Sequence, residues 1–324
     1  MIFYDFEVFK YDWLVVLFDG NEVTKIHNDV EQLRSYYEKN KKDVWVGYNN
    51  KGYDQYILQC ILCDLNPKSL NDWIIKERKA PWDFSELLKQ YPVITYDCMV
   101  FSKSLKQLES YLGVNIHETD VNFDIDRPLT EDELELSFKY CQDDVENTVR
   151  VFLINKDEFN ASMGLVNYAN LDISKLSKTK AQLTSYIMGA KKLPKSLLDE
   201  EFEFKYVQAV KDYDYKHKDV IEFFDNIRIT KDANSKYDTV ISGCPTTFAL
   251  GGIHGAKPNY ICTVQEDECL LHTDVASYYP HLMKNWGLLT RAISNSDKLS
   301  EIMAKRLKLK KEKNPLQKVL KVSN

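Results

Sequence analysis

Five acidic and aromatic side chains in the first 144 residues have types and spacings that suit metal-ion chemistry. Asp5 and Glu7 are two residues apart in a run typical of a strand, so both side chains point to the same face. Tyr140 and Asp144 are four residues apart in a predicted helix and again share one face. Carboxylates are ligands that Mg²⁺ prefers, and two such ions about 3.5–4 Å apart can activate water and stabilise a departing oxyanion. Together with Asp54, these residues predict a two-metal hydrolytic site.

Each of these pairs is common on its own, because the chain has 49 acidic residues among 324. An isolated Asp-x-Glu pair is typical of a solvated strand face, and a tyrosine four residues before an acid is typical of an ordinary helix surface. The order of the segments and the intervening run Gly-Tyr-Asn-Asn-Lys-Gly-Tyr-Asp, residues 47–54, favour the metal site over these two interpretations.

A second segment that could carry chemistry is Asp-Val-Ala-Ser-Tyr-Tyr-Pro, residues 274–280. Asp274 ends the apolar run from Leu270, which predicts a core strand with a carboxylate at the sheet edge, a good position for a catalytic ion. Ser277 opens a turn whose backbone N–H groups are suited to cradling phosphates. Tyr279 would then form a floor beneath a sugar. An ordinary strand end followed by an aromatic turn is the alternative interpretation.

The elements expected around the first site form a mixed α/β arrangement. The predicted strands are 2–8, 13–18, 44–48 and 93–97. The predicted helices are 30–39, 53–65, 105–112, and one that a capping box at Thr130–Glu133 opens and that ends near 154. Strands followed by helices indicate a sheet with helices packed on it, ending near residue 165. Residues 170–240 are expected to be helical and charged, 277–285 a turn into a helix, and 297–321 a basic helix broken at Asn314-Pro315.

The composition is that of an ordinary globular protein of about two domains. A hydrophobic fraction of 44% without a run of about 18 apolar residues excludes a membrane span. Seven scattered cysteines indicate reduced thiols in a cytosolic protein, and the lone pair Cys60 and Cys63 favours core packing over zinc. The net charge of −6 conceals a C-terminal segment, residues 300–324, that carries +6 and could bind phosphates.

The three acidic motifs resemble those of the ribonuclease-H-like, DEDDy-type 3′→5′ exonuclease domain of proofreading DNA polymerases, over about residues 1–165. The resemblance implies that the ligands of two Mg²⁺ or Mn²⁺ ions are Asp5, Glu7, Asp54 and Asp144. It also implies that Tyr140 orients the attacking water. Asn49 would contact the single-stranded 3′ end of DNA, although its neighbour Asn50 leaves the choice between the two open.

Residues 274–280 are similar to the first polymerase motif of phage-like family B DNA polymerases. The resemblance implies that Asp274 and the Val275 carbonyl bind the polymerase ions, and that the incoming dNTP contacts Ser277 and Tyr278. Tyr279 would exclude ribonucleotides by clashing with a 2′-hydroxyl. Tyr278 stands where many members of the family have leucine.

Residues 247–255 resemble the Gly-Gly motif of the same family, in which Gly251 and Gly252 would let the backbone approach the template strand. A plain turn is the alternative interpretation of the two glycines. Arg306, on the basic helix of the expected fingers, would face the nucleotide triphosphate, and a plain solvated face is the alternative. Lys321 would also face it, because residues 320–324 resemble the start of the second polymerase motif, with the spacing one residue short.

The expected organisation is an exonuclease domain at 1–165, a linker and N-terminal palm part at 166–296, and the beginning of the fingers at 297–324. Because the third polymerase motif is absent, synthesis is expected only with a C-terminal half that is missing or separately encoded. The expected partners are single-stranded DNA 3′ ends, primer–template and dNTPs, in the cytoplasm of a bacterial host of a phage or prophage. A free-standing 3′→5′ exonuclease and a catalytically idle DNA-binding subunit of a split polymerase are the two alternatives.

Overall fold

The structure is a computed structural model that describes residues 1–100, 103–111, 113, 121–194, 218–230, 232, 234–289, 292–293, 297–314 and 316–322. The chain divides into two compact units. The sheet unit comprises Met1–Lys191 with Ile293–Asn324, and the hairpin unit comprises Lys192–Ala292. No helix in the described part of the chain is long and apolar enough to cross a membrane.

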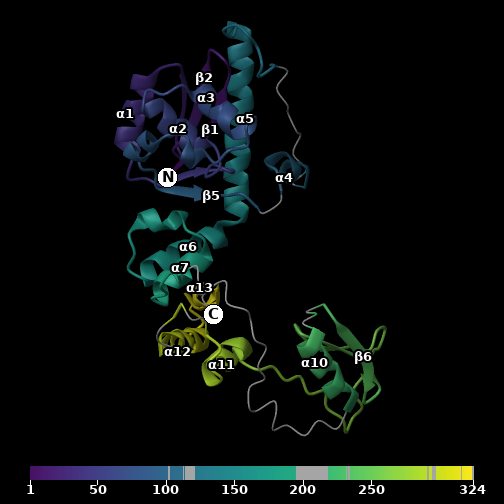
Figure 1. Cartoon of the computed structure of the whole chain (residues 1–324). Coiled ribbons are helices and arrows are strands. Elements are labelled where there is room, and N and C mark those ends of the chain that lie inside the picture. The colour runs from purple at the N-terminus through teal and green to yellow at the C-terminus, as the bar shows by residue number, and fades with distance from the viewer. Residues whose placement is uncertain are drawn as a thin grey trace. The chain divides into compact units, whose positions relative to one another are not determined.

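A mixed five-stranded sheet forms the centre of the sheet unit, in the spatial order β3-β2-β1-β4-β5 (Figure 1). The strands are β1 (Ile2–Val8), β2 (Trp13–Phe18), β3 (Val23–His27), β4 (Trp45–Gly47) and β5 (Thr95–Asp97). The first three strands pair antiparallel, whereas β4 runs parallel to β1 and β5 runs parallel to β4. The predicted strands are confirmed, with β4 and β5 shorter than expected, and the edge strand β3 is an addition.

Both faces of this sheet are covered, which explains why its central strands are apolar on both sides. One face packs on α1 (Val30–Asn40), α2 (Asp54–Leu62) and α3 (Pro67–Ile75). The other face packs on the long helix α5 (Glu131–Ile154). In β1, Tyr4, Phe6 and Val8 belong to the first face, and Phe3 belongs to the α5 face.

Helix α5 is the longest element of the sheet unit and begins where its capping box predicts. The Glu133 backbone N–H donates to Thr130 Oγ1 at 3.3 Å, and the Thr130 N–H donates to Glu133 Oε2 at 2.9 Å. Such a box satisfies two of the backbone donors that a helix start leaves unpaired. Helix α2 ends at Leu62, before the predicted residue 65, because Asp64 takes a left-handed conformation with φ 56°.

Of the other described helices of the sheet unit, α4 precedes α5 in the chain and the rest follow it. They are α4 (Leu105–Tyr111), α6 (Lys156–Tyr168), α7 (Lys180–Ile187), α12 (Asp297–Lys311) and α13 (Leu316–Val322). Short 3₁₀ turns occupy Pro81–Asp83, Glu86–Gln90 and Ile173–Ser177.

The C-terminal helices α12 and α13 belong to the sheet unit, which differs from the expected boundaries at 166 and 297. Gly164 on α6 makes this packing possible. A Cβ built on Gly164 would lie 3.0 Å from both γ-carbons of Val319 on α13. The neighbouring Leu320 is fully buried, as are Leu299 and Ile302 of α12. The C-terminal basic helices therefore pack on the helices that follow the sheet.

In its described residues, the hairpin unit has a small antiparallel sheet and two helices. Its elements are α10 (Lys218–Thr230), β6 (Lys236–Ile241), β7 (Cys244–Ala249), β8 (Gly252–Gly255) and α11 (Tyr278–Asn285). The expectation of helix up to residue 240 is wrong at β6, whose alternating half-buried and exposed residues form a one-sided strand.

The prediction of a core strand over Leu270–Asp274 is also wrong. The side chains of Leu270 and Leu271 are 72% and 81% exposed, and the segment has no strand structure. A strand needs a neighbour to satisfy its backbone N–H and C=O groups. None of the described strands pairs with this segment, so its apolar character does not produce a strand.

Candidate metal centre

Strand β1 directs the first two carboxylates toward α5. Asp5 and Glu7 alternate with Phe6 along the strand, so they share the face of Phe3 that packs on the long helix. Glu7 is 9% exposed. The central position of β1 in the sheet, between β2 and β4, holds this pair of carboxylates on a rigid element.

The third carboxylate reaches the site because a tight loop turns the chain from β4 into α2. Asp97, at the end of β5, accepts hydrogen bonds from the backbone N–H groups of Asn49 at 2.9 Å and Lys51 at 3.3 Å. Gly47 has no room for a side chain, since a Cβ there would lie 2.7 Å from Asn50 Cβ. Asp54 opens α2 directly after this loop.

The carboxylate of Asp54 is fixed against the central strand. Its Oδ1 accepts a hydrogen bond of 3.1 Å from the backbone N–H of Phe6, the residue between Asp5 and Glu7. Asp54 is also buried, with 3% of its surface exposed. Residues 48 positions apart in the sequence are thereby joined at one point of the sheet.

Helix α5 contributes the fourth carboxylate, Asp144, and the aromatic ring of Tyr140 one turn before it. A lysine that the sequence analysis did not single out contacts both. Lys106 Nζ on α4 lies 2.6 Å from Asp144 Oδ1 and 4.6 Å from the centre of the Tyr140 ring. The same Nζ lies 3.5 Å from Glu109 Oε1, and Glu109 accepts a hydrogen bond of 2.9 Å from Asn147.

The sequence held a weak signal for this lysine. Lys106 and Glu109 are three residues apart in a predicted helix, which is an ordinary surface pair. Glu109 is only 1% exposed, however, and a buried acid needs a partner. Only the packing of α4 on α5 brings this pair to Asp144.

The four carboxylates raise one another's pKa values. Burial, and then the negative charges of Asp54 and Glu7, raise the pKa of Asp5 well above its ordinary value. The pKa of Asp54 is raised to about 7, mainly by burial and also by the charges of Asp97 and Asp144, while the hydrogen bond from Phe6 N–H opposes this rise. The pKa of Glu7 is raised by burial and by Asp144 and Asp54, and Lys106 opposes this rise.

Asp144 and Tyr140 respond to the same environment. Burial raises the pKa of Asp144, while the ion pair with Lys106 lowers it. Burial and the charges of Asp144, Glu7 and Asp5 raise the pKa of the Tyr140 hydroxyl, so it remains a hydrogen-bond donor at neutral pH. Mutual repulsion of this kind favours proton uptake or the binding of a cation.

This donor set fits a divalent cation. The side-chain oxygens of Glu7 accept no hydrogen bond within the part of the chain that the structure describes, although the residue is nine-tenths buried. Buried charges in proteins are paired or coordinate metals. Asp5 and Glu7 lie near ligand spacing, with one ligand atom each within 4.8 Å of the other and of Cys141. Asp54 and Asp144 form no such group of three with them among the described residues, and they act on the same carboxylates through their charges, which Lys106 partly balances.

The two asparagines of the loop differ in accessibility. Asn49 is exposed and takes a left-handed conformation with φ 60°. Asn50 is fully buried and its amide donates to Thr95 Oγ1 at 2.9 Å, so it supports the loop from within. Of the two, only Asn49 is accessible to a strand of nucleic acid.

The residues of the second predicted site lie in the hairpin unit. Asp274 and Val275 are exposed, and Ser277 takes a left-handed conformation, φ 53°, at the N-terminus of α11. Tyr278 and Tyr279 are 51% and 65% exposed, with ring centroids 5.5 Å apart. The described residues form no cluster of three metal-ligating side chains around Asp274.

The other predicted polymerase residues are distributed over both units. Gly251 lies in the turn between β7 and β8, and Gly252 is the first residue of β8. Arg306 is half-buried on α12, and Lys321 is exposed on α13. Both belong to the sheet unit, whereas Asp274 belongs to the hairpin unit.

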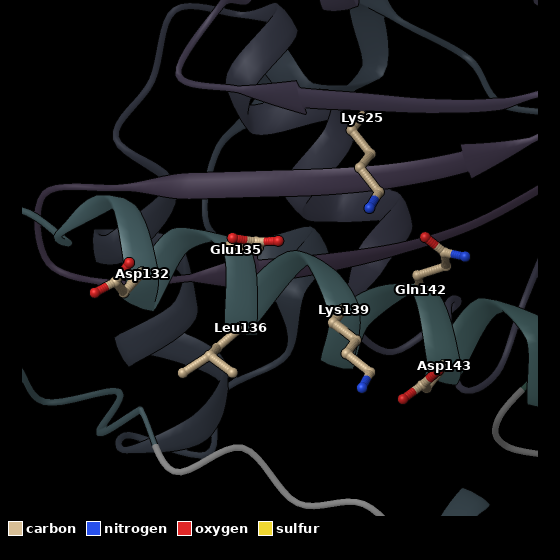
Figure 2. A pocket seen from close by; sticks show the side chains of 7 residues that line it. All are labelled: Lys25, Asp132, Glu135, Leu136, Lys139, Gln142 and Asp143. Carbon is tan, nitrogen blue, oxygen red and sulfur yellow. The ribbon is translucent and has the colours of Figure 1, made fainter.

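A separate pocket of about 550 Å³ lies between the edge strand β3 and α5 (Figure 2). Its lining residues are Lys25, Asp132, Glu135, Leu136, Lys139, Gln142 and Asp143. The side chain of Lys25 points toward α5, and the helix contributes both acidic and basic groups (Figure 2). None of the four clustered carboxylates lines this pocket, and its mixed charges specify no ligand class.

Comparisons with known proteins identify no relative of this chain. No protein-family model matches it, and neither the curated proteins nor the solved structures provide a significant match.

Proposed function

We propose that the sheet unit is a metal-dependent 3′→5′ exonuclease of the DEDDy type that acts on DNA. One observation carries the proposal. Four buried or half-buried carboxylates from β1, α2 and α5 influence one another's pKa values, and Tyr140 lies beside them. Carboxylates this close destabilise the protein when no cation is bound, because they repel one another. A group of this kind suits a reaction that uses two metal ions.

The sheet supports a ribonuclease-H-like fold as part of the same proposal. Three antiparallel strands continue into two parallel strands, with β1 in the centre and the long helix α5 on one face. In this arrangement the central strand supplies two carboxylates and the helix supplies the last one.

Asp5, Glu7, Asp54 and Asp144 would hold Mg²⁺ or Mn²⁺. When bound, two such ions supply an activated water and stabilise the charge on the departing 3′ oxygen. The protein's own groups prepare the site. Phe6 N–H fixes Asp54, Lys106 fixes Asp144, and the protonated hydroxyl of Tyr140 can donate to the attacking water.

The substrate class follows from the surroundings of the site. Asn49 is exposed on the loop that leads to Asp54 and can donate to a sugar or phosphate of a single strand. We therefore propose a frayed or single-stranded 3′ end as the substrate.

The experiment is cleavage of a 5′-labelled single-stranded oligonucleotide by the full chain, with Mg²⁺, Mn²⁺ or Ca²⁺. Asp144→Asn should lower the rate by about 10³-fold or more, and Tyr140→Phe by about 10²-fold. Asp143→Asn is the matched control, because Asp143 lines the separate pocket and should retain activity. Equal loss in Asp143→Asn and Asp144→Asn, or an intact oligonucleotide with folded wild type, would refute the proposal.

A polymerase-type nucleotide site in the hairpin unit is a second candidate. It is favoured by the accessible side chain of Asp274 and by the left-handed turn at Ser277 that opens α11 near Tyr279. Binding of a fluorescent dNTP with Mg²⁺ tests it. Asp274→Ala should weaken binding about tenfold or more, and Asp267→Ala on the same exposed segment should not.

A further inference from the structure

Cys141 lies inside the candidate metal centre and has no part in the proposed reaction. It follows Tyr140 on α5 and is 0% exposed. Its Sγ lies 3.2 Å from the backbone oxygen of Asp5 and 3.7 Å from Asp5 Oδ2. The thiol therefore touches a carboxylate that is a candidate metal ligand.

One of the three separations between the donor atoms has the length expected in a tetrahedral metal site, and the other two are below 4.8 Å. One ligand atom each from Asp5, Glu7 and Cys141 lies within 4.8 Å of the others. A zinc ion with Zn–S of about 2.3 Å and Zn–O of about 2.1 Å separates sulfur and oxygen by about 3.6 Å. The observed 3.7 Å between Cys141 Sγ and Asp5 Oδ2 matches that separation.

A second observation is that Glu7 is buried without a hydrogen-bond donor. Glu7 is 9% exposed as a residue, and its carboxylate accepts no hydrogen bond from any described residue. It also lies close enough to Cys141 and Asp5 to bind the same ion. A buried carboxylate without a donor favours a bound cation.

We infer that Asp5, Glu7 and Cys141 form a binding site for a borderline-soft divalent cation of the Zn²⁺ class. Mg²⁺ takes oxygen ligands in octahedral geometry, so the sulfur does not serve it, whereas Zn²⁺ and Co²⁺ accept mixed oxygen and sulfur ligands. On binding, the metal–sulfur bond replaces the S–H bond, and the proton leaves to solvent. A water completes the fourth position.

This site has a consequence that rests on the proposed function. Because Asp5 and Glu7 would serve both kinds of ion, Zn²⁺ should compete with Mg²⁺ and inhibit the exonuclease. The binding test itself requires no DNA and no activity, so the two proposals can fail separately.

The test is titration of the metal-free full chain with Co²⁺, followed by absorption spectroscopy. The wild type should show the near-ultraviolet thiolate-to-cobalt charge-transfer band and the visible bands of tetrahedral cobalt. Zn²⁺ should displace the cobalt and abolish the charge-transfer band, whereas Mg²⁺ at the same concentration should leave the band in place. Cys141→Ser should lose this band and bind Zn²⁺ about tenfold or more weakly.

The control is the double variant Cys262→Ser and Cys269→Ser, which removes the two exposed thiols and should keep the band. Cys141→Ala guards against a folding defect, with circular dichroism and thermal melting measured on each variant. A band that persists in folded Cys141→Ser and Cys141→Ala, or one that disappears in the double variant, overturns the inference. Cobalt binding to wild type without a charge-transfer band does so as well.

Discussion

At the scale of single residues, Lys106 opposes the acidity of the metal centre. Its Nζ is 2.6 Å from Asp144, and its charge lowers the pKa values of Asp144 and Glu7. Carboxylates must be ionised to bind a divalent cation. The lysine thus extends the pH range over which these ligands are available.

We expect Lys106→Met to shift the acidic limb of the pH–rate profile to higher pH by about one unit. The variant removes the charge and keeps the length of the side chain. Lys103→Met is the control, because Lys103 lies on the adjoining segment and contacts the Tyr111 ring instead. An acidic limb that stays in place in Lys106→Met would contradict this role.

The raised pKa of Asp54 makes the metal-free protein sensitive to pH. Its pKa is about 7 in the folded chain against an ordinary value of 3.8. The folded state therefore binds the proton more tightly, so this group's stabilising contribution is complete below about pH 4 and is lost as the pH rises toward 7.

Asp54→Asn should accordingly stabilise the metal-free protein at pH 7, by about 1–3 kcal/mol, and have little effect at pH 4. The amide oxygen can still accept from Phe6 N–H. Urea unfolding at both pH values with a chelator present measures the difference. Mg²⁺ should stabilise the wild type more than the variant. Destabilisation of the variant at both pH values would show that burial does not govern this group.

At the scale of elements, the contact of α6 with α13 determines what the C-terminal helices do. Gly164 allows Val319 to approach, and Leu320 and Ile302 are fully buried. Burying side chains of this size contributes about 1.5–3 kcal/mol each. The same helices carry the exposed lysines of α12, so a basic surface is built on an apolar interface.

Val319→Asp should detach these helices and destabilise the sheet unit by about 2–4 kcal/mol, because it places a charge in the α6–α13 contact. Lys313→Asp is the control. Lys313 is exposed at a left-handed turn position, φ 53°, that aspartate tolerates, so the change should cost less than about 1 kcal/mol. Thermal melting of both variants measures the effect. Similar melting temperatures for the two would place Val319 outside the packed interface.

At the scale of the whole molecule, the two units are not two consecutive segments of the chain. The sheet unit draws on both ends of the sequence, Met1–Lys191 and Ile293–Asn324, and the hairpin unit is inserted between them. Removing the C-terminal segment should therefore damage the sheet unit, whereas removing the insertion should not.

Replacing residues 192–292 by a flexible Gly/Ser linker of about 20 residues, which spans about 25 Å, should leave the sheet unit folded and able to cleave short single strands. Deleting residues 293–324 should instead lower its melting temperature, because α6 loses its partner. Circular dichroism and the nuclease assay on both deletions decide between the two divisions. If only the internal deletion caused unfolding, the division into consecutive domains at residues 166 and 297 would be supported instead.

Local residue patterns were sufficient to predict most helices and strands of the sheet unit. β1, β2, α1 and α5 begin and end within about a residue of their predicted bounds, because alternation, helical periodicity and the capping box at Thr130 are all local signals. The pattern failed at Leu270–Asp274, where an apolar run has the propensity of a strand and no neighbour to pair with.

The candidate site divides in the same way. Residue spacing alone predicts that Asp5 and Glu7 share one strand face and that Tyr140 and Asp144 share one helix face, because both relations depend only on backbone periodicity. The distant groups that join them are found only in the folded chain. Phe6 N–H fixes Asp54, Lys106 contacts Asp144, and Cys141 contacts Asp5, across separations of 48, 38 and 136 residues. Such contacts depend on how the sheet and helices pack, and no local pattern of residues encodes that packing.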